Sequence, residues 1–340
     1  MLYPKFKACS AHVAPVFLNA KATVHKACSL MAEAARAGAK LIAFPESFVP
    51  AFPVWAAVSP PIHNHEFFKQ LAAESIEVPG PEVQQLSEAA RENEIIVSIG
   101  ISERSPISVG CLWNSNLLIG ADGALLNHHR KLMPTFYEKL IWAPGDGAGL
   151  RVLDTTVGKL GMLICGENTN PLARYSLMAQ GEQVHVSSYP PVWPTRPSNQ
   201  PGRYDLAAAI RIRAGAHSFE GKVFNIVSSA LLDKSAFDAL QGLGREARET
   251  LEQSPQAVSM FIGPSGEVVS DTLSESEGLL YQGIDISQCV EPKQFHDVVG
   301  YYNRFDVFDL TVRRKRLSPV RVLDEMDNAQ TERSSEGDAA

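Results

Sequence analysis

The sequence predicts a mixed α/β protein in which strands and helices pack in layers. Of its 340 residues, 45% are hydrophobic and 20% are charged, which is enough apolar material for a sizeable core. Short apolar runs alternate along the chain with longer segments whose apolar residues recur at helical spacing. We find no repeat and no internal linker, so we expect a single domain over residues 1–322.

Short apolar or alternating runs, several of them bounded by Gly or Pro, indicate the strands. The runs are residues 6–14, 41–44, 95–103, 113–120, 125–131, 160–165, 184–189, 223–230, 257–264, 266–271 and 279–286. Asp122-Gly123 predicts a hairpin turn, and a second hairpin is expected around Pro264-Ser265-Gly266. These runs supply enough strands for more than one layer.

Apolar residues at i, i+3, i+4 and i+7 indicate the helices, together with capping residues. A first helix is expected from Asn19, a good N-cap, to about Arg36, where Gly38 follows. The other expected helices are residues 64–75, 81–93, 171–181 and 203–219. The proline-rich residues 50–62 predict a loop.

Charge and hydropathy exclude several classes of protein. Lys and Arg number 31 and Asp and Glu number 38, so the net charge is −7, which does not fit a nucleic-acid-binding protein. No uninterrupted apolar stretch predicts a membrane span, and the first residues do not fit a signal peptide. We therefore expect a cytoplasmic protein with no membrane partner. Residues 323–340 are polar and charged, which predicts a disordered tail.

Cys165 is the cysteine placed best for chemistry. The five cysteines are widely spaced without a C-x-x-C pair, which argues against disulfides and a thiolate zinc site. Cys165 ends a predicted strand just before a helix that begins near Pro171, and a helix N-terminus favours a thiolate. Gly166 would let a ligand approach the backbone. The alternative is a buried structural cysteine.

Glu46 is the second candidate, because it follows an apolar strand ending in Phe44 and Pro45. Ligands of α/β sheets gather at the carboxyl ends of strands, and a partly desolvated carboxylate there suits a general acid and base. The alternative is an exposed loop glutamate. Lys131 and Glu138, taken alone, are most simply interpreted as solvated surface charges.

We expect no metal ion and no organic cofactor. His128 and His129 are adjacent, so on a strand their side chains would point to opposite faces. No ligand pattern completes a site around His63 and His65. The glycine-rich residues 145–149 are not followed by the Lys-Ser or Lys-Thr of a phosphate loop, and no G-x-S-x-G is present.

Three motifs occur in an order that resembles the nitrilase superfamily of carbon–nitrogen hydrolases. They are FPES (44–47), HHRKLMPTFYEKLIWAPGDG (128–147) and ICGENTNPLARY (164–175), and the resemblance covers about residues 5–315. It implies a four-layer αββα sandwich. It also implies Glu46 as general base, Lys131 as catalytic lysine, Cys165 as nucleophile and Glu138 as supporting glutamate.

Within that superfamily the details resemble the nitrilase branch. These details are C-x-E-N at the nucleophile, YPPVWP at 189–194, GDG at 145–147 and DVF at 306–308. The chain departs from many nitrilases at Gly166, where they have Trp, at Tyr301, where they have His, and at Phe305, where they have Pro. These departures concern the substrate range and the C-terminal contacts.

The resemblance implies hydrolysis of a small-molecule nitrile to a carboxylic acid and ammonia through a cysteine thioimidate. Candidate substrate-binding residues are Gly166, Asn168, Tyr189 and Trp193, although the aromatic ones could equally belong to the core. The alternatives are an amide hydrolase, a nitrile or cyanide hydratase on the same residues, and a non-catalytic binding paralogue. The family also implies a homodimer or a larger helical homo-oligomer. The apolar run 307–312 predicts a late strand that a partner subunit covers or that folds back on the core.

Overall fold

Two β-sheets form the centre of the protein. The computed structural model describes residues 3–317, so the predicted tail over 323–340 lies outside the described residues. The first sheet has six strands, which pair in the order β11-β1-β2-β3-β4-β5. Their bounds are β1 Lys5–His12, β2 Ala39–Ala43, β3 Ile96–Arg104, β4 Leu112–Ile119, β5 Leu125–Arg130 and β11 Gly278–Asp285.

The second sheet has five strands in the order β10-β9-β8-β7-β6. Their bounds are β6 Leu153–Thr155, β7 Gly158–Ile164, β8 Val184–Tyr189, β9 Phe224–Ser229 and β10 Met260–Ile262. Strands β7, β8 and β9 are parallel, as are β1, β2 and β3 in the first sheet. The carboxyl ends of parallel neighbours meet at one edge of each sheet, where ligand sites of such sheets usually lie.

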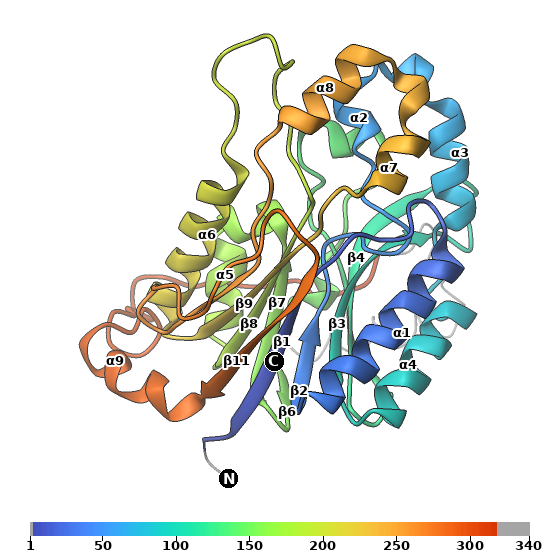
Figure 1. Ribbon diagram of the computed structural model, residues 1–340. Helices are drawn as coiled ribbons and strands as arrows, with labels where there is room; N and C mark the ends of the chain where they lie inside the picture. Colours follow the sequence, from blue (N-terminus) through green and yellow to red (C-terminus); the bar gives the residue numbers. More distant parts are fainter. Residues whose placement is uncertain (1–2, 318–340) are drawn as a thin grey trace, which may run out of the picture.

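Helices cover the outer face of each sheet (Figure 1). Helices α1 (Ala20–Arg36) and α4 (Pro81–Glu92) lie beside the first sheet, and α5 (Pro171–Met178) and α6 (Leu206–Gly221) lie beside the second. Apolar residues of both sheets pack against each other between the layers, among them Leu41, Ala43, Leu160, Met162 and Val184. The layers therefore run α-β-β-α, which confirms the expected sandwich.

Two hydroxyl groups fix the sheets to each other. The Ser10 hydroxyl of β1 donates to the carbonyl of Val227 in β9 at 2.7 Å. In return, the Ser228 hydroxyl of β9 donates to the carbonyl of Ala11 in β1 at 2.8 Å. Because side chains of this length cross the gap directly, β1 and β9 lie close together, and the strand ends of the two sheets come near each other.

Short helices cover one end of the sandwich, at the top in Figure 1. They are α2 (Trp55–Val58), α3 (His65–Glu74), α7 (Lys234–Ala239) and α8 (Arg245–Gln253). A fifth short helix, α9 (Val290–Phe295), does not belong to this end. The expectation of a plain loop over 50–62 is wrong, because Trp55 is buried and α2 forms around it. The sequence pattern does not predict α7, α8 or α9, which are short and bury few apolar residues.

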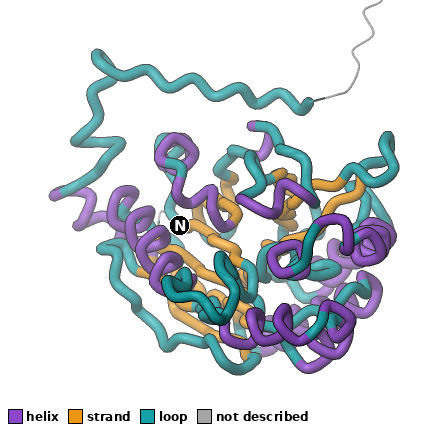
Figure 2. Tube along the Cα trace, turned by 90° about the horizontal axis from the view of Figure 1, so that it is seen from above, coloured by secondary structure: helices purple, strands orange, loops and turns teal. Residues whose placement is uncertain are grey.

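Two expected strands are absent from the described residues. Residues 266–271 form a single bridge, Ile262 with Val268, instead of a hairpin strand. Residues 307–312 form no strand and run as an extended loop along one side of the molecule (Figure 2). Among residues 3–317 they pair with no strand, so alternation of apolar residues alone does not produce a strand there. None of the described helices has the length and apolarity that a membrane crossing requires.

Candidate active site

Three strand ends carry the predicted site residues. Glu46 follows β2, Lys131 follows β5 directly, and Cys165 follows β7. Glu138 lies in a short 3₁₀ helix, Phe136–Leu140, a few residues beyond Lys131. The first two residues belong to one sheet and Cys165 to the other, so the packing of the two sheets brings them together.

The Lys131 ammonium group lies between two carboxylates. Its Nζ atom is 2.7 Å from Oε1 of Glu46 and 2.7 and 2.8 Å from the two oxygens of Glu138. Asn114 donates from Nδ2 to the same Glu46 Oε1 at 2.7 Å, whereas Glu46 Oε2 has no hydrogen-bond partner among the described residues. All three charged side chains are buried. The free oxygen of Glu46 is thus available to accept a proton.

Cys165 completes the cluster. Its sulfur and carboxylate oxygens of Glu46 and Glu138 lie within 4.8 Å of one another. Its φ angle is 46°, in the left-handed region that non-glycine residues rarely adopt. Such backbone strain persists only where the surroundings hold it, and it often marks a functional residue.

The protonation state of Cys165 differs from the expectation. Burial, and next the negative charge of Glu46, raise the pKa of the thiol well above its usual value, although Lys131 acts in the opposite direction. The helix N-terminus therefore does not produce a resting thiolate here. The nearby 3₁₀ helix, Cys165–Thr169, separates the sulfur from α5, which Asn170 caps. The group at rest is a thiol that needs a base.

Lys131 and Glu138 each shift the pKa of the other. Burial disfavours the ammonium, but the carboxylates of Glu138 and Glu46 outweigh it and raise the pKa of Lys131. Burial, with further repulsion from Glu46, raises the pKa of Glu138 to about 7 even though Lys131 lowers it. With one cation between two carboxylates, the cluster retains one negative charge that a proton can neutralise.

Glu167 joins the strands that carry Lys131 and Cys165, a role that motif matching alone does not reveal. Its carboxylate accepts from the backbone N–H of Leu132 at 2.6 Å and of Ile164 at 2.9 Å. It also pairs with His129 Nε2 at 2.9 Å. The segment that carries Lys131 and the segment that carries Cys165 are therefore both hydrogen-bonded to the buried Glu167 carboxylate.

Two glycines allow the close approach of the site loops. A Cβ atom at Gly100 of β3 would collide with the backbone of residues 45–47, so its absence makes room for Glu46. A Cβ atom at Gly166 would lie 2.7 Å from the Thr135 hydroxyl oxygen. The space beside Gly166 is thus filled by Thr135 of the loop that carries Glu138. A larger side chain at position 166 would require Thr135 to move.

The aromatic candidates, Tyr189 and Trp193, lie in the same buried apolar cluster as Cys165. Trp193 stacks on Tyr137 with ring centroids 4.4 Å apart, and the Tyr137 hydroxyl has no partner among the described residues. Asn168 differs from them, because both ends of its amide group are hydrogen-bonded to other protein atoms.

His128 and His129 take opposite directions, as predicted. His128 pairs with Glu103 at 2.7 Å, and His129 pairs with Glu167 on the other face of β5. Glu46, Glu138 and Cys165 lie close enough to one another to hold a metal ion. The Lys131 ammonium group already pairs with both of these carboxylates as their cation. The donor set is therefore arranged for proton transfer.

Comparison with known proteins identifies the family of this chain. Residues 7–294 match the family model described as carbon–nitrogen hydrolase. A nitrilase of Paraburkholderia phymatum is 31% identical over 316 residues, which are 92% of this chain and 88% of that protein. An aliphatic nitrilase of Rhodococcus rhodochrous is 34% identical over 318 residues, 93% of this chain and 84% of that protein.

Among solved structures, the Nit3 protein of Saccharomyces cerevisiae, a member of branch 10 of the nitrilase superfamily, has a TM-score of 0.66. It is 19% identical and covers 89% of this chain and 97% of its own, which shows a shared fold. Together with the family match, these findings show that the chain belongs to the carbon–nitrogen hydrolase family, in its nitrilase branch, and is a hydrolase of carbon–nitrogen bonds.

Proposed function

We propose that the protein hydrolyses an organic nitrile to the carboxylic acid and ammonia through covalent intermediates on Cys165. The observation that supports this most is the buried cluster of Glu46, Lys131, Glu138 and Cys165. It places a thiol within 4.8 Å of a carboxylate oxygen of Glu46, and the Oε2 atom of Glu46 has no hydrogen-bond partner among the described residues. The names of the relatives support a nitrile as the substrate.

In the first step the Cys165 sulfur attacks the nitrile carbon. The thiol proton passes to Glu46 and from there to the nitrile nitrogen, so a thioimidate forms and the C≡N bond loses one π bond. The raised pKa of the thiol favours this order, because a resting thiolate beside two carboxylates is unfavourable. Lys131 stabilises the negative charge that develops during attack.

In the second step Glu46 activates a water molecule, which adds to the thioimidate carbon. The tetrahedral species expels ammonia after proton transfer from Glu46 and leaves a thioester on Cys165. A second water cleaves this thioester and releases the acid and the free thiol. Two waters are consumed for each nitrile, and all proton transfers use groups of this site. Glu138 holds the Lys131 ammonium in place through both of its oxygens.

The aromatic residues that share an apolar cluster with Cys165 favour a substrate with an apolar substituent. Tyr137, Tyr189 and Trp193 are buried in this cluster, and Phe52 packs against Trp193. Apolar pocket walls with few polar groups bind ligands mainly through the hydrophobic effect. Gly166, which follows Cys165 directly, would lie next to the reacting atoms, whereas Asn168 bonds the backbone carbonyl of Cys165.

The second candidate function is an amide hydrolase or a nitrile or cyanide hydratase on the same residues. A hydratase forms the same thioimidate but releases an amide, because the tetrahedral species expels sulfur and not ammonia. A panel of aliphatic, aromatic and arylacetonitrile substrates, together with the matching amides and cyanide, distinguishes these reactions when acid, ammonia and amide are all quantified. We expect acid and ammonia in equal amounts. Turnover of amides alone, or amide as the main product, would exclude the proposal.

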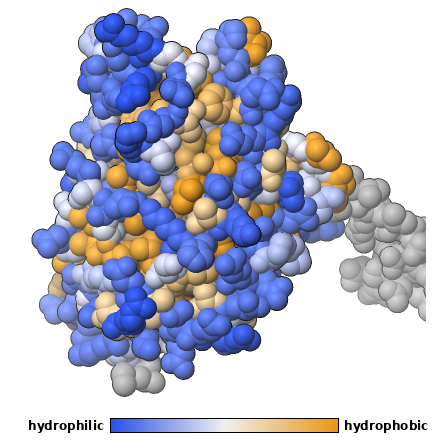
Figure 3. Space-filling view, turned by 45° about the vertical axis from the view of Figure 1, so that its right-hand side comes forward, coloured by the Kyte–Doolittle hydropathy of each residue, from blue (hydrophilic) through white to orange (hydrophobic). Residues whose placement is uncertain are grey.

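We further propose that the protein acts as a homo-oligomer in the cytoplasm. Apolar side chains of the extended segment 304–317 are exposed, with Phe305 and Phe308 76% and 74% accessible. Apolar surface is visible beside the grey residues in Figure 3, where the described chain ends. Exposed apolar surface of this kind indicates an interface, and a second copy of the chain is the partner that the family implies. The five free cysteines suit a reducing compartment.

A further inference from the structure

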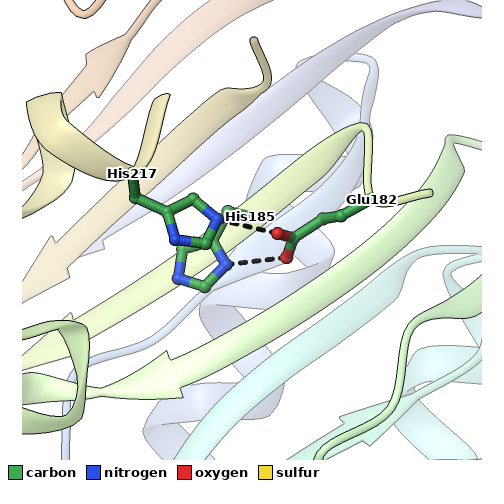
Figure 4. A group of neighbouring side chains, drawn as sticks. All are labelled: Glu182, His185 and His217. Carbon is green, nitrogen blue, oxygen red and sulfur yellow. Dashed lines mark hydrogen bonds and ion pairs between the residues drawn. The ribbon is translucent and has the colours of Figure 1, made fainter. Parts of the chain in front are cut away.

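A second buried cluster of titratable side chains lies behind the nucleophile. Glu182 precedes β8, His185 lies on β8 and His217 on α6, and none of the three is more than 2% exposed. Figure 4 shows both imidazoles directed at the carboxylate of Glu182. His185 Nδ1 is 2.7 Å from Oε1, and His217 Nε2 is 2.7 Å from Oε2. The proposed mechanism uses none of these groups.

Asn168 connects this cluster to Cys165. Its Nδ2 atom donates to the backbone carbonyl of Cys165 at 3.1 Å and to that of Leu163 at 3.3 Å. Carbonyl oxygens only accept, so these two bonds fix which end of the amide is nitrogen. The Oδ1 atom of Asn168 therefore faces the Nε2 atom of His185 at 3.0 Å and the Ser187 hydroxyl at 3.1 Å.

Both ring nitrogens of His185 consequently face acceptors. Nδ1 faces the carboxylate of Glu182 and Nε2 faces the amide oxygen of Asn168. A neutral imidazole carries a single N–H and can satisfy only one of these bonds, whereas an imidazolium donates both. A bare nitrogen lone pair against either buried oxygen would be an uncompensated repulsion. The hydrogen-bond geometry thus requires a charged His185.

His217 has the opposite requirement. Its Nε2 donates to Glu182, and its Nδ1 has no partner among the described residues, so one proton is sufficient. The pKa values agree with one cation beside one anion. The two imidazoles lower the pKa of Glu182 to about 2 against the effect of burial, and burial followed by the charge of His185 lowers the pKa of His217 to about 4. The Arg174 guanidinium, which pairs with Glu220, also disfavours a second charge on His217.

The arrangement does not suit a metal ion. The two imidazole rings are stacked, with centroids 3.8 Å apart and planes inclined by 28°. Lone pairs in nearly parallel ring planes run side by side and do not converge on one point, as metal ligands must. Each nitrogen instead meets a different oxygen of Glu182. Gly161 of β7 makes room for this carboxylate, because a Cβ atom there would collide with it.

We propose that His185, as an imidazolium that donates from both ring nitrogens, is a positioning residue for Cys165 through Asn168. The imidazolium polarises and orients the Asn168 amide. This amide bonds the carbonyl of Cys165 and so holds the backbone of Cys165 in its left-handed conformation. Charge-assisted hydrogen bonds are about twice as strong as neutral ones, which suits a chain that must maintain a strained backbone. This inference rests on the proposed role of Cys165 as nucleophile.

The protonation state is tested first on the wild-type protein. Neutron diffraction, or nitrogen-15 NMR of histidine-labelled protein, shows which ring nitrogens carry a proton at about pH 8, where a free imidazole is neutral. We expect protons on both nitrogens of His185 and on Nε2 alone of His217. A single proton on His185 would overturn the proposal, as would a stoichiometric bound metal in elemental analysis of the purified protein.

Two variants then separate positioning from folding. In His185→Asn the amide stands near the place of Nδ1, so it keeps a donor to Glu182 and loses the one to Asn168. In His185→Gln the amide stands near the place of Nε2 and keeps the donor to Asn168. The control is His12→Asn, which changes another fully buried histidine, one that bonds Ser229 and Ser259.

The readouts are kcat, KM and the rate at which iodoacetamide alkylates Cys165, each measured on folded protein. We expect His185→Asn to lower kcat and the alkylation rate at least about ten-fold with little change in KM, since small displacements of a reacting group cost this much or more. We expect His185→Gln to remain within about three-fold of wild type and His12→Asn to lose stability but not alkylation rate. Equal effects of all three variants would contradict positioning. Alkylation and protonation report on this chain even if the nitrile assay fails, so the two proposals fail separately.

Discussion

At the residue scale, the site is organised around one excess negative charge. The Lys131 ammonium group supplies one positive charge between two carboxylates, and its Nζ atom pairs with both Glu46 and Glu138. A thiol proton transferred to Glu46 therefore stays inside a cluster that already favours a proton. The chemistry depends on the charge of each group, and substitutions that keep shape but remove charge test it most directly.

Charge removal gives the first prediction. Lys131→Gln and Glu46→Gln should each lower kcat at least about 10²-fold, the usual contribution of an oxyanion-stabilising or acid–base group. Glu138→Gln should cost less, because it acts only through the position of Lys131. Initial rates on a nitrile are compared with circular dichroism spectra as a folding control. A folded Lys131→Gln protein with near-native rate would disprove the role given to this lysine.

The thiols give the second prediction. Cys165→Ala should abolish turnover, whereas Cys9→Ala and Cys289→Ala should keep most of it. Burial raises the pKa of each of these two thiols to about 12. Neither belongs to the cluster in which Glu46 and Glu138 lie close to Cys165, so neither has this base to remove its proton. Cys28→Ala and Cys111→Ala should also remain active. Loss of activity in any of these four variants without loss of fold would show that a second thiol takes part.

At the scale of elements, local sequence predicts most strands and the long helices but not the short ones. Helix α1 agrees with its expected start, because Asn19 accepts from the N–H of Ala22 as an N-cap. The sequence pattern does not predict helix α8, because its few buried residues, Ala247 and Leu251 among them, lie in a highly charged segment. The contacts that stabilise such helices come from distant parts of the chain and leave little local pattern.

The hydrogen bonds of Glu182 to His185 of β8 and His217 of α6 predict that the protein is less stable in acid. In the unfolded chain His217 takes up a proton below about pH 6.5, but in the folded protein burial lowers its pKa to about 4. The unfolded state thus binds more protons between these values, so the free energy of unfolding falls as the pH falls through this window, by up to about 3 kcal/mol. Urea unfolding at about pH 7.5 and about pH 4.5 measures the loss. His217→Gln should flatten this dependence, and an unchanged slope in that variant would assign the loss to other groups.

At the scale of the whole molecule, the site could be predicted from motifs but not from local properties. Taken alone, Lys131 and Glu138 look like surface charges, yet both are buried. They meet Cys165 only because the two sheets pack face to face, which no local pattern encodes. The resemblance to a known family supplied this long-range information. Asn168, in contrast, lies inside a matching motif and is predicted from it to bind substrate, but its amide bonds the backbone carbonyl of Cys165. A motif does not reveal where a side chain points.

The C-terminal segment gives a prediction for the assembly. Truncation after Leu323 should leave oligomer size and activity unchanged, whereas truncation before Val307 should lose both. The removed residues include Val312, which packs against the cluster of Leu150 and Leu163, and Arg316, which pairs with Asp146 at 3.2 Å. Light scattering and nitrile turnover of both truncated proteins provide the measurement. A fully active monomer without residues 307–340 would show that the segment is dispensable.

The proposed mechanism requires that Cys165 forms a covalent bond to the substrate carbon. Mass spectrometry of protein that is quenched with acid during nitrile turnover tests it most directly. We predict an added mass equal to the thioimidate or the acyl group, located on the peptide that contains Cys165 and absent from Cys165→Ala. Sustained turnover with no adduct on Cys165, or with the adduct on another residue, would contradict the account.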